Sequence, residues 1–66
     1  MQLTINGDLR DVGDAATVAA LLQQLDLDPR AVVVELNRVI VRRPAVESTP
    51  IRSGDSVEIV HFVGGG

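Results

Sequence analysis

Cysteine is absent from this sequence, and several kinds of chemistry are excluded with it. A chain without thiols forms no disulfide, and it holds no thiolate metal site, iron–sulfur cluster or persulfide on its own side chains. The one histidine, His61, cannot hold a metal ion alone, and the nine acidic residues are scattered instead of standing at ligand spacing. We therefore expect neither a metal site nor a bound cofactor in this chain.

Lysine is absent as well, so all six basic residues are arginines, and the formal net charge is −3. A negative field repels phosphate backbones, and the arginines form no basic stripe, which argues against a nucleic-acid partner. No apolar run approaches the roughly 20 residues needed to cross a bilayer, and the N-terminus lacks the basic region of a signal peptide. We expect a cytoplasmic protein that binds no membrane.

The chain is short. Its 66 residues form one domain, and a domain of this size buries only about 60% of the surface that its unfolded chain exposes. This is enough for one two-layer core and too little for a pocket that encloses several catalytic groups. The length favours a carrier, a modifier or a binding module over an enzyme.

The first residues predict a β-hairpin. Gln2–Ile5 alternates polar and apolar side chains, and Asp8–Val12 resumes the extended pattern. Between them, Asn6-Gly7 supplies two residues that tolerate positive φ, as a tight hairpin turn requires.

One amphipathic helix follows the hairpin. Four aliphatic residues stand at i, i+3, i+4 and i+7, namely Val18, Leu21, Leu22 and Leu25. Thr17 is placed to cap the first turn, although Asp14 could cap an earlier start. The helix ends at the segment Asp26–Arg30, in which Pro29 lacks an amide proton.

Three extended segments come after the helix. β-branched residues dominate Val32–Leu36 and, after a short connection, Val39–Val41. Arg42–Pro50 contains two prolines and is expected to be irregular. A turn held by the side chain of Asp55 then leads into the last and most apolar strand, Val57–Val63.

This order of elements predicts an α+β fold of the ubiquitin-like β-grasp type. A mixed sheet of four to five strands packs on one helix, and the last strand, apolar on both faces, takes a central position parallel to the first strand. Residues 1–63 form the β-grasp domain. Residues 64–66 form a flexible glycine tail.

The tail consists of Gly64, Gly65 and Gly66. Glycine has the largest entropy to lose on ordering, so three in succession need a reason. Without Cβ atoms, such a tail can thread a narrow channel of a partner and reach about 10 Å from the folded body. A free α-carboxylate is an anion at neutral pH and a poor electrophile. The carboxylate of Gly66 would therefore need activation by a partner enzyme, for example by adenylylation, before a sulfur nucleophile could convert it into a thiocarboxylate.

Two apolar residues just before the tail are candidates for partner docking. If Val57 and Ile59 face the helix, alternation turns Val60 and Phe62 outward. The alternative is that Phe62, the only aromatic residue, anchors the core. We assign no catalytic role to His61, because an ionised carboxylate has no proton to give to a base.

Four sequence features are spread over essentially the whole chain. They are Thr17-Val18 with Leu21-Leu22 and Leu25, Val34-Glu35-Leu36-Asn37 with Ile40-Val41, Gly54-Asp55-Ser56-Val57-Glu58-Ile59, and Val63-Gly64-Gly65-Gly66. Together they resemble the ThiS family, the sulfur carriers of thiamine thiazole synthesis. One departure is that many relatives read Val-Pro-Arg followed by tryptophan where this chain has Val41-Arg42-Arg43-Pro44, so that only Arg43 matches.

The resemblance implies a reaction that partner enzymes carry out on Gly66. An E1-like adenylyltransferase (ThiF in that family) adenylylates the terminal glycine with ATP and Mg²⁺, and a sulfur donor such as a cysteine desulfurase supplies the sulfur. The thiocarboxylate then docks on thiazole synthase (ThiG) and gives up its sulfur there. The chain itself is a carrier and binds no cofactor.

Other functions are compatible with the same tail. Carriers of molybdopterin synthesis share the chemistry but tend to be longer, and a carrier for cysteine synthesis is not excluded by the tail. A ubiquitin-like modifier would join Gly66 to a lysine of a target protein, and a β-grasp binding module would leave the tail inert.

Overall fold

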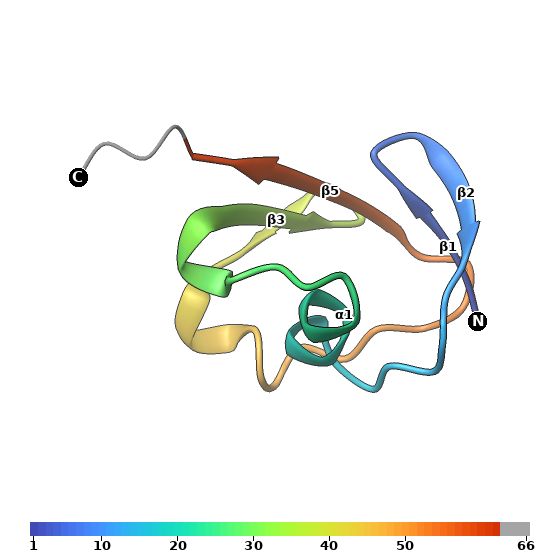
Figure 1. Ribbon diagram of the computed structural model, residues 1–66, viewed down its shortest axis with the longest axis horizontal. Coiled ribbons are helices and arrows are strands. Elements are labelled where there is room, and N and C mark those ends of the chain that lie inside the picture. The colour runs from blue at the N-terminus through green and yellow to red at the C-terminus, as the bar shows by residue number, and fades with distance from the viewer. Residues whose placement is uncertain (63–66) are drawn as a thin grey trace.

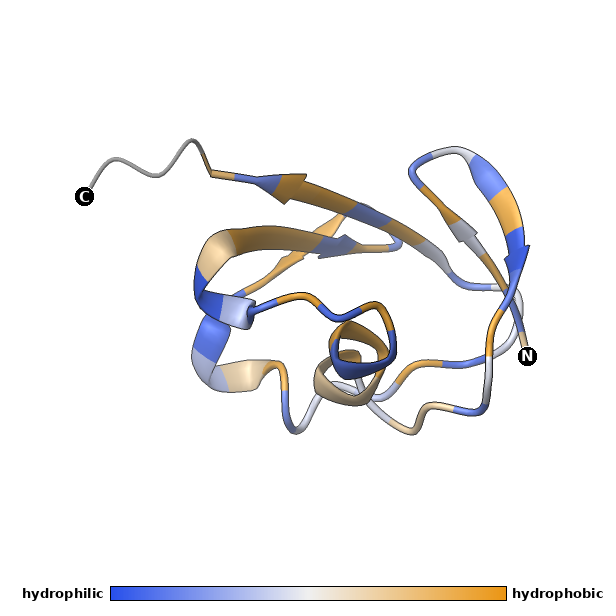
Figure 2. Cartoon of the chain, viewed as in Figure 1, coloured by the Kyte–Doolittle hydropathy of each residue, from blue (hydrophilic) through white to orange (hydrophobic). Residues whose placement is uncertain are grey.

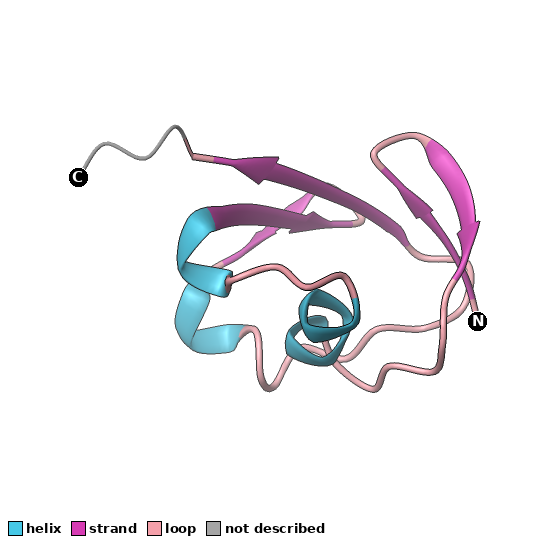
Figure 3. Cartoon of the chain, viewed as in Figure 1, coloured by secondary structure: helices cyan, strands magenta, loops and turns pink. Residues whose placement is uncertain are grey.

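A five-stranded sheet covers one α-helix in residues 1–62, the part of the chain that the computed structural model describes (Figure 1). The elements follow the chain in the order β1 (Gln2–Ile5), β2 (Asp8–Asp11), α1 (Val18–Gln24), a 3₁₀ turn (Pro29–Ala31), β3 (Val32–Leu36), β4 (Val39–Val41), a 3₁₀ turn (Arg43–Ala45) and β5 (Ser56–His61). Figure 3 shows both short 3₁₀ turns at the same end of the molecule.

The last strand occupies the middle of the sheet, as its sequence predicts. The strand order is β2-β1-β5-β3-β4, with β5 parallel to β1 and antiparallel to β3. Helix α1 lies beneath one face (Figure 1). The β-grasp prediction is therefore confirmed, with five strands.

The side chains between sheet and helix form the core. Figure 2 shows β3 and β5 as mostly hydrophobic ribbons above the helix. The fully buried side chains come from both layers, namely Leu3, Val18, Leu21, Leu22, Val34 and Val57. The opposite face of the sheet has no element of residues 1–62 packed over it.

Thr17 caps the helix, and the earlier start at Asp14 is wrong. The hydroxyl of Thr17 accepts a hydrogen bond from the amide of Ala20 at 3.2 Å, and α1 begins at Val18. A side-chain cap of this kind replaces one of the partners that the first amides of a helix lack.

Both hairpins turn through residues with positive φ. Asn6 and Gly7 have φ values of 51° and 84°, and Asn37 and Arg38 have values of 50° and 71°. Two consecutive positive φ angles match the twist of a tight two-residue hairpin turn. The first turn follows directly from its Asn-Gly sequence, whereas the second places an arginine where glycine is usual.

The side chains of the two turn asparagines also form hydrogen bonds to β5 and to the residue before it. The side chain of Asn6 donates to the carbonyl of Ile59 at 3.1 Å and accepts from the Ile59 amide at 2.7 Å. The side chain of Asn37 accepts from the amide of Ser56 at 2.9 Å and donates to Asp55 Oδ1 at 3.1 Å. Asn6 thus extends the pairing of β5 beyond the end of β1.

The predicted boundaries need small corrections. Strand β2 ends at Asp11, and the stretch predicted as irregular contains the 3₁₀ turn that begins at Arg43. Strand β5 starts one residue early, at Ser56, and its described part ends at His61. The side chain of Asp55 holds the preceding turn, as predicted, by accepting from the amide of Arg52 at 2.8 Å. No helix in the described part is long and apolar enough to cross a membrane.

Candidate functional site

Strand β5 brings the chain directly to the predicted tail. Its inward side chains, Val57 and Ile59, are buried in the core. Beyond the end of the strand, the amide of Phe62 donates to the carbonyl of Ala31 at 2.9 Å. The middle strand is therefore held in place up to the last residue that the structure describes.

The three glycines lie outside the described residues. The covalent attachment at Gly66 and the threading of Gly64 and Gly65 through a partner's channel remain predictions. The boundary between the domain and the tail at residue 63 also falls beyond residue 62.

Val60 and Phe62 lie on the sheet face opposite the helix, as alternation predicts. Val60 is 61% exposed and Phe62 is 55% exposed. This exposure contradicts the alternative in which Phe62 anchors the core. Their role in docking is not tested by the exposure and remains a prediction.

The register adds two residues to this surface that the sequence analysis missed. Val33 pairs with Val60, and Ile40 pairs with Glu35, so both lie on the outer face. We call the four apolar residues Val33, Ile40, Val60 and Phe62 the outer patch. Alternation along Val32–Leu36 could have placed Val33 on the outer face. The first three residues of this strand are all valine, however, so the sequence alone does not show which of them faces the core, and only the pairing with β5 does.

A cavity lies beside the outer patch, at the end of the sheet where β3 begins and β4 ends. Its volume is about 220 Å³, and its lining includes Val33, Ile40, Phe62, Arg42 and Arg43. Arg43, the residue that matches the family pattern, therefore stands next to the apolar surface that precedes the tail. Pro44 lies within the first turn of the 3₁₀ segment, where its fixed φ is tolerated.

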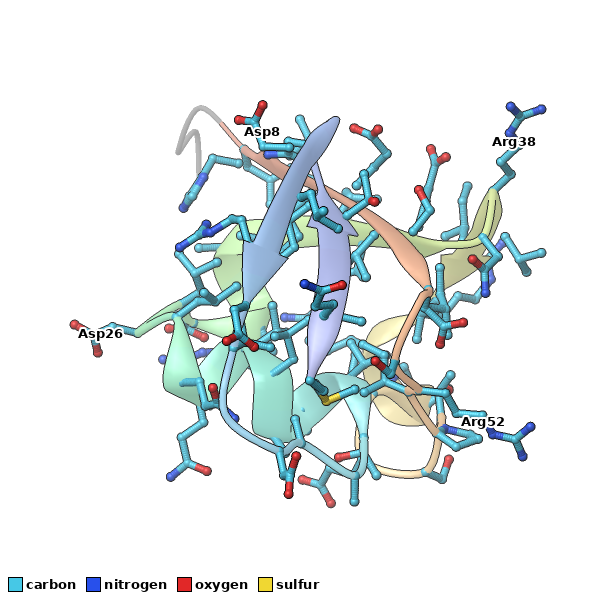
Figure 4. The ribbon with its side chains drawn as sticks, turned by 90° about the vertical axis from the view of Figure 1, so that its right-hand side faces the viewer. Asp8, Asp26, Arg38 and Arg52 are labelled. Carbon is cyan, nitrogen blue, oxygen red and sulfur yellow. The ribbon has the colours of Figure 1, made fainter. Side chains whose placement is uncertain are left out.

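The charges around the cavity differ in how they are paired. Arg30 donates to both carboxylate oxygens of Asp28, with Nη2 to Oδ2 at 3.0 Å. The side-chain hydrogen bond from Arg30, followed by that from its amide, holds the pKa of Asp28 below its ordinary value. Within residues 1–62, Arg42 and Arg43 form no ion pair. Charged side chains at the turns, such as Asp26 and Arg38, point away from the body (Figure 4).

The described residues offer an exposed apolar surface at the end of β5. Within them, no group of three or more histidine, cysteine, aspartate or glutamate side chains could hold a metal ion. The arrangement can dock against a partner, because β5 is hydrogen-bonded to β3 up to His61 and exposed apolar side chains lie beside its last residues.

Known proteins resemble this chain over its whole length. A family model described as the ThiS family matches residues 3–66. The sulfur carrier protein ThiS of Bacillus subtilis is 37% identical over 65 residues, which cover 97% of this chain and 98% of that protein. The crystal structure of the thiamine biosynthesis protein ThiS of Geobacter metallireducens superposes with a TM-score of 0.84 at 39% identity, covering all of both chains.

A second kind of relative is much longer than this chain. A thiazole synthase of Paramagnetospirillum magneticum is 44% identical over all 66 residues, which span 20% of its length. A thiazole synthase of Magnetococcus marinus shows the same coverage at 33% identity. A stretch similar to this chain is thus part of the thiazole synthase polypeptide in both proteins. On the match of residues 3–66 and the full-length likeness to the Bacillus protein, the chain belongs to the ThiS family.

Proposed function

We propose that this protein is a sulfur carrier of thiamine biosynthesis and that the carboxylate of Gly66 is its working group. The observation that carries the proposal is the position of β5, which lies between β1 and β3 in the sheet and ends at His61, three residues before Gly64 in the sequence. A rigid strand followed by residues without Cβ atoms can hold a chain end inside a narrow channel. Family membership supports the same reading.

The proposed reaction has two steps, both on partner enzymes. A carboxylate oxygen of Gly66 attacks the α-phosphate of ATP, pyrophosphate leaves, and an acyl-adenylate forms. Hydrosulfide then attacks the acyl carbon and AMP leaves, which gives the thiocarboxylate. The first step requires an E1-like adenylyltransferase that binds ATP and Mg²⁺. The second requires sulfide, which a sulfur donor such as a cysteine desulfurase supplies when a thiol reductant cleaves its persulfide. The carrier is a co-substrate and not an enzyme, and we expect it to act in the cytoplasm.

Thiazole synthase is the proposed acceptor of the sulfur. Two thiazole synthases contain a stretch similar to this entire chain, which supports a working contact between the two parts. Val60 and Phe62 are the proposed docking residues, because both are exposed beside the strand that carries the tail. Apolar exposed patches of this kind are typical of protein interfaces.

The proposal is tested by the intact mass of the protein after incubation with an E1-like adenylyltransferase, ATP, Mg²⁺ and sulfide. We expect one oxygen to be replaced by one sulfur in the full-length chain. A variant that lacks Gly66 serves as the control and should keep its mass. If a competent enzyme leaves the full-length chain unchanged, the protein is not a sulfur carrier.

A further inference from the structure

Two glutamates face each other on the outer face of the sheet. Glu35 of β3 pairs directly with Glu58 of β5. The residues on either side of them, Val34 at 1% exposure and Val57 at 0%, point into the core. Because side chains alternate along a strand, both carboxylates stand on the side away from the helix.

We expect this pairing to destabilise the isolated protein. Like charges placed directly opposite each other destabilise a sheet, whereas opposite charges at the same positions stabilise it. No arginine of the described part forms an ion pair with either glutamate, since the ion pairs there involve only the N-terminus and Arg30. The chain also carries a formal net charge of −3, which adds to the repulsion.

Apolar residues lie beside the two carboxylates on two sides. The next pair along the same strands is Val33 and Val60, and Ile40 lies opposite Glu35 on β4. Val60 is 61% exposed and Ile40 is 57% exposed. A partner that covers these side chains would also exclude water from the carboxylates, and their charges would then act more strongly on a neighbouring group.

We propose that Glu35 and Glu58 together receive one arginine or lysine side chain of thiazole synthase, while apolar residues of the synthase cover the outer patch. This inference rests on the proposed function, which supplies the partner. A cation between two anions offsets both charges, and a guanidinium group can donate to two carboxylates at once. The repulsion within the free carrier thus becomes an attraction in the complex.

A second copy of this chain fits the surface less well. A symmetric dimer through this face would bring the same two glutamates of both copies together. The excess of acidic over basic residues would oppose that contact as well.

The position of the two glutamates allows them to orient the bound partner. Glu58 stands four residues before Phe62 along the chain, a distance of about 13 Å in an extended strand. The cation bound between the glutamates and the apolar contact at Phe62 are two contacts of the partner, and both lie along β5. The partner is thereby oriented along β5, the strand that precedes the tail in the sequence.

The test compares the double variant E35Q/E58Q with the matched control E47Q, an exposed glutamate outside the sheet. The affinity of each protein for thiazole synthase is measured by calorimetry at low and high salt. We expect E35Q/E58Q to bind about tenfold more weakly than the wild type and to lose most of the salt dependence. E47Q should bind as the wild type does.

The melting temperature of the free carrier provides a second readout. Removal of the repulsion should raise the Tm of E35Q/E58Q by about 2–4 °C while binding weakens. The variant E58R, which places an arginine opposite Glu35, should show the same combination of higher Tm and weaker binding. A variant that merely disturbed the fold would lower both the Tm and the affinity.

Two results would overturn the inference. One is binding by E35Q/E58Q with the affinity and salt dependence of the wild type. The other is no binding of the wild type to thiazole synthase even at low salt. The second result would also remove thiazole synthase as the proposed acceptor of the sulfur. Formation of the thiocarboxylate is decided separately, by the mass of the wild-type protein after activation.

Discussion

At the scale of single residues, the two hairpin turns differ in how well their residue types tolerate the positive φ angles of the turn. Gly7 adopts a φ of 84° and Arg38 a φ of 71°. A residue with a Cβ atom is disfavoured in this region by about 1–2 kcal/mol, whereas glycine is not. The arginine is tolerated because its side chain extends freely from the tip of the turn (Figure 4).

Arg38→Gly should therefore stabilise the protein. The relief of backbone strain exceeds the extra entropy that glycine gives the unfolded chain, so we expect a gain of about 0.5–1 kcal/mol in the free energy of unfolding. Urea unfolding followed by circular dichroism measures the change. Gly7→Ala is the matched control and should lose stability, since no heavy atom lies within 4 Å of a Cβ atom at that position and only the backbone is affected. Equal or lower stability of Arg38→Gly would contradict the strain argument.

At the scale of elements, the hairpins depend on contacts with β5 that the local sequence cannot reveal. Asn6-Gly7 predicts a turn, and the structure confirms it, but nothing nearby in the chain indicates that Asn6 bonds to Ile59. The helix was predictable because its apolar spacing and its cap are local features. The pairing of Glu35 with Glu58 was not, because the register between β3 and β5 depends on the closure of the whole sheet.

Asn6→Gly should weaken the junction between the first hairpin and β5. Glycine accepts the positive φ of the turn, so the substitution isolates the loss of two hydrogen bonds. It leaves the amide and carbonyl of the buried Ile59 without these partners, at a cost of about 1–3 kcal/mol. Asn37→Gly should cost less, because its side-chain bonds are exposed to water.

Hydrogen exchange of the Ile59 amide locates the effect. We expect this amide to exchange faster in Asn6→Gly than in Asn37→Gly. If both variants lose the same stability, or if Asn6→Gly loses none, then the side chain of Asn6 does not hold the hairpin to the middle strand.

At the scale of the whole molecule, the core and the proposed chemistry occupy separate parts of the chain. Among residues 1–62, the buried core residues lie between Leu3 and Ile59. The sequence analysis could propose Gly66 as the working group because this proposal depends on residue type and position, not on packing. It found only half of the outer patch, because Val33 and Ile40 come from strands that meet β5 through long-range pairing.

This separation predicts that Gly65→Ala blocks activation without changing stability. A methyl group on the tail should clash with the walls of a channel that admits glycine, while all the core contacts that determine the Tm remain. Pyrophosphate exchange catalysed by the E1-like enzyme measures adenylylation, and calorimetry measures the Tm. Deletion of Gly66 should give the same loss of exchange at an unchanged Tm, whereas E47Q should preserve both. Normal exchange by Gly65→Ala would mean that the tail reaches the adenylylating site without passing through a narrow channel, and a fall in Tm would mean that residue 65 contributes to folding as well as to function.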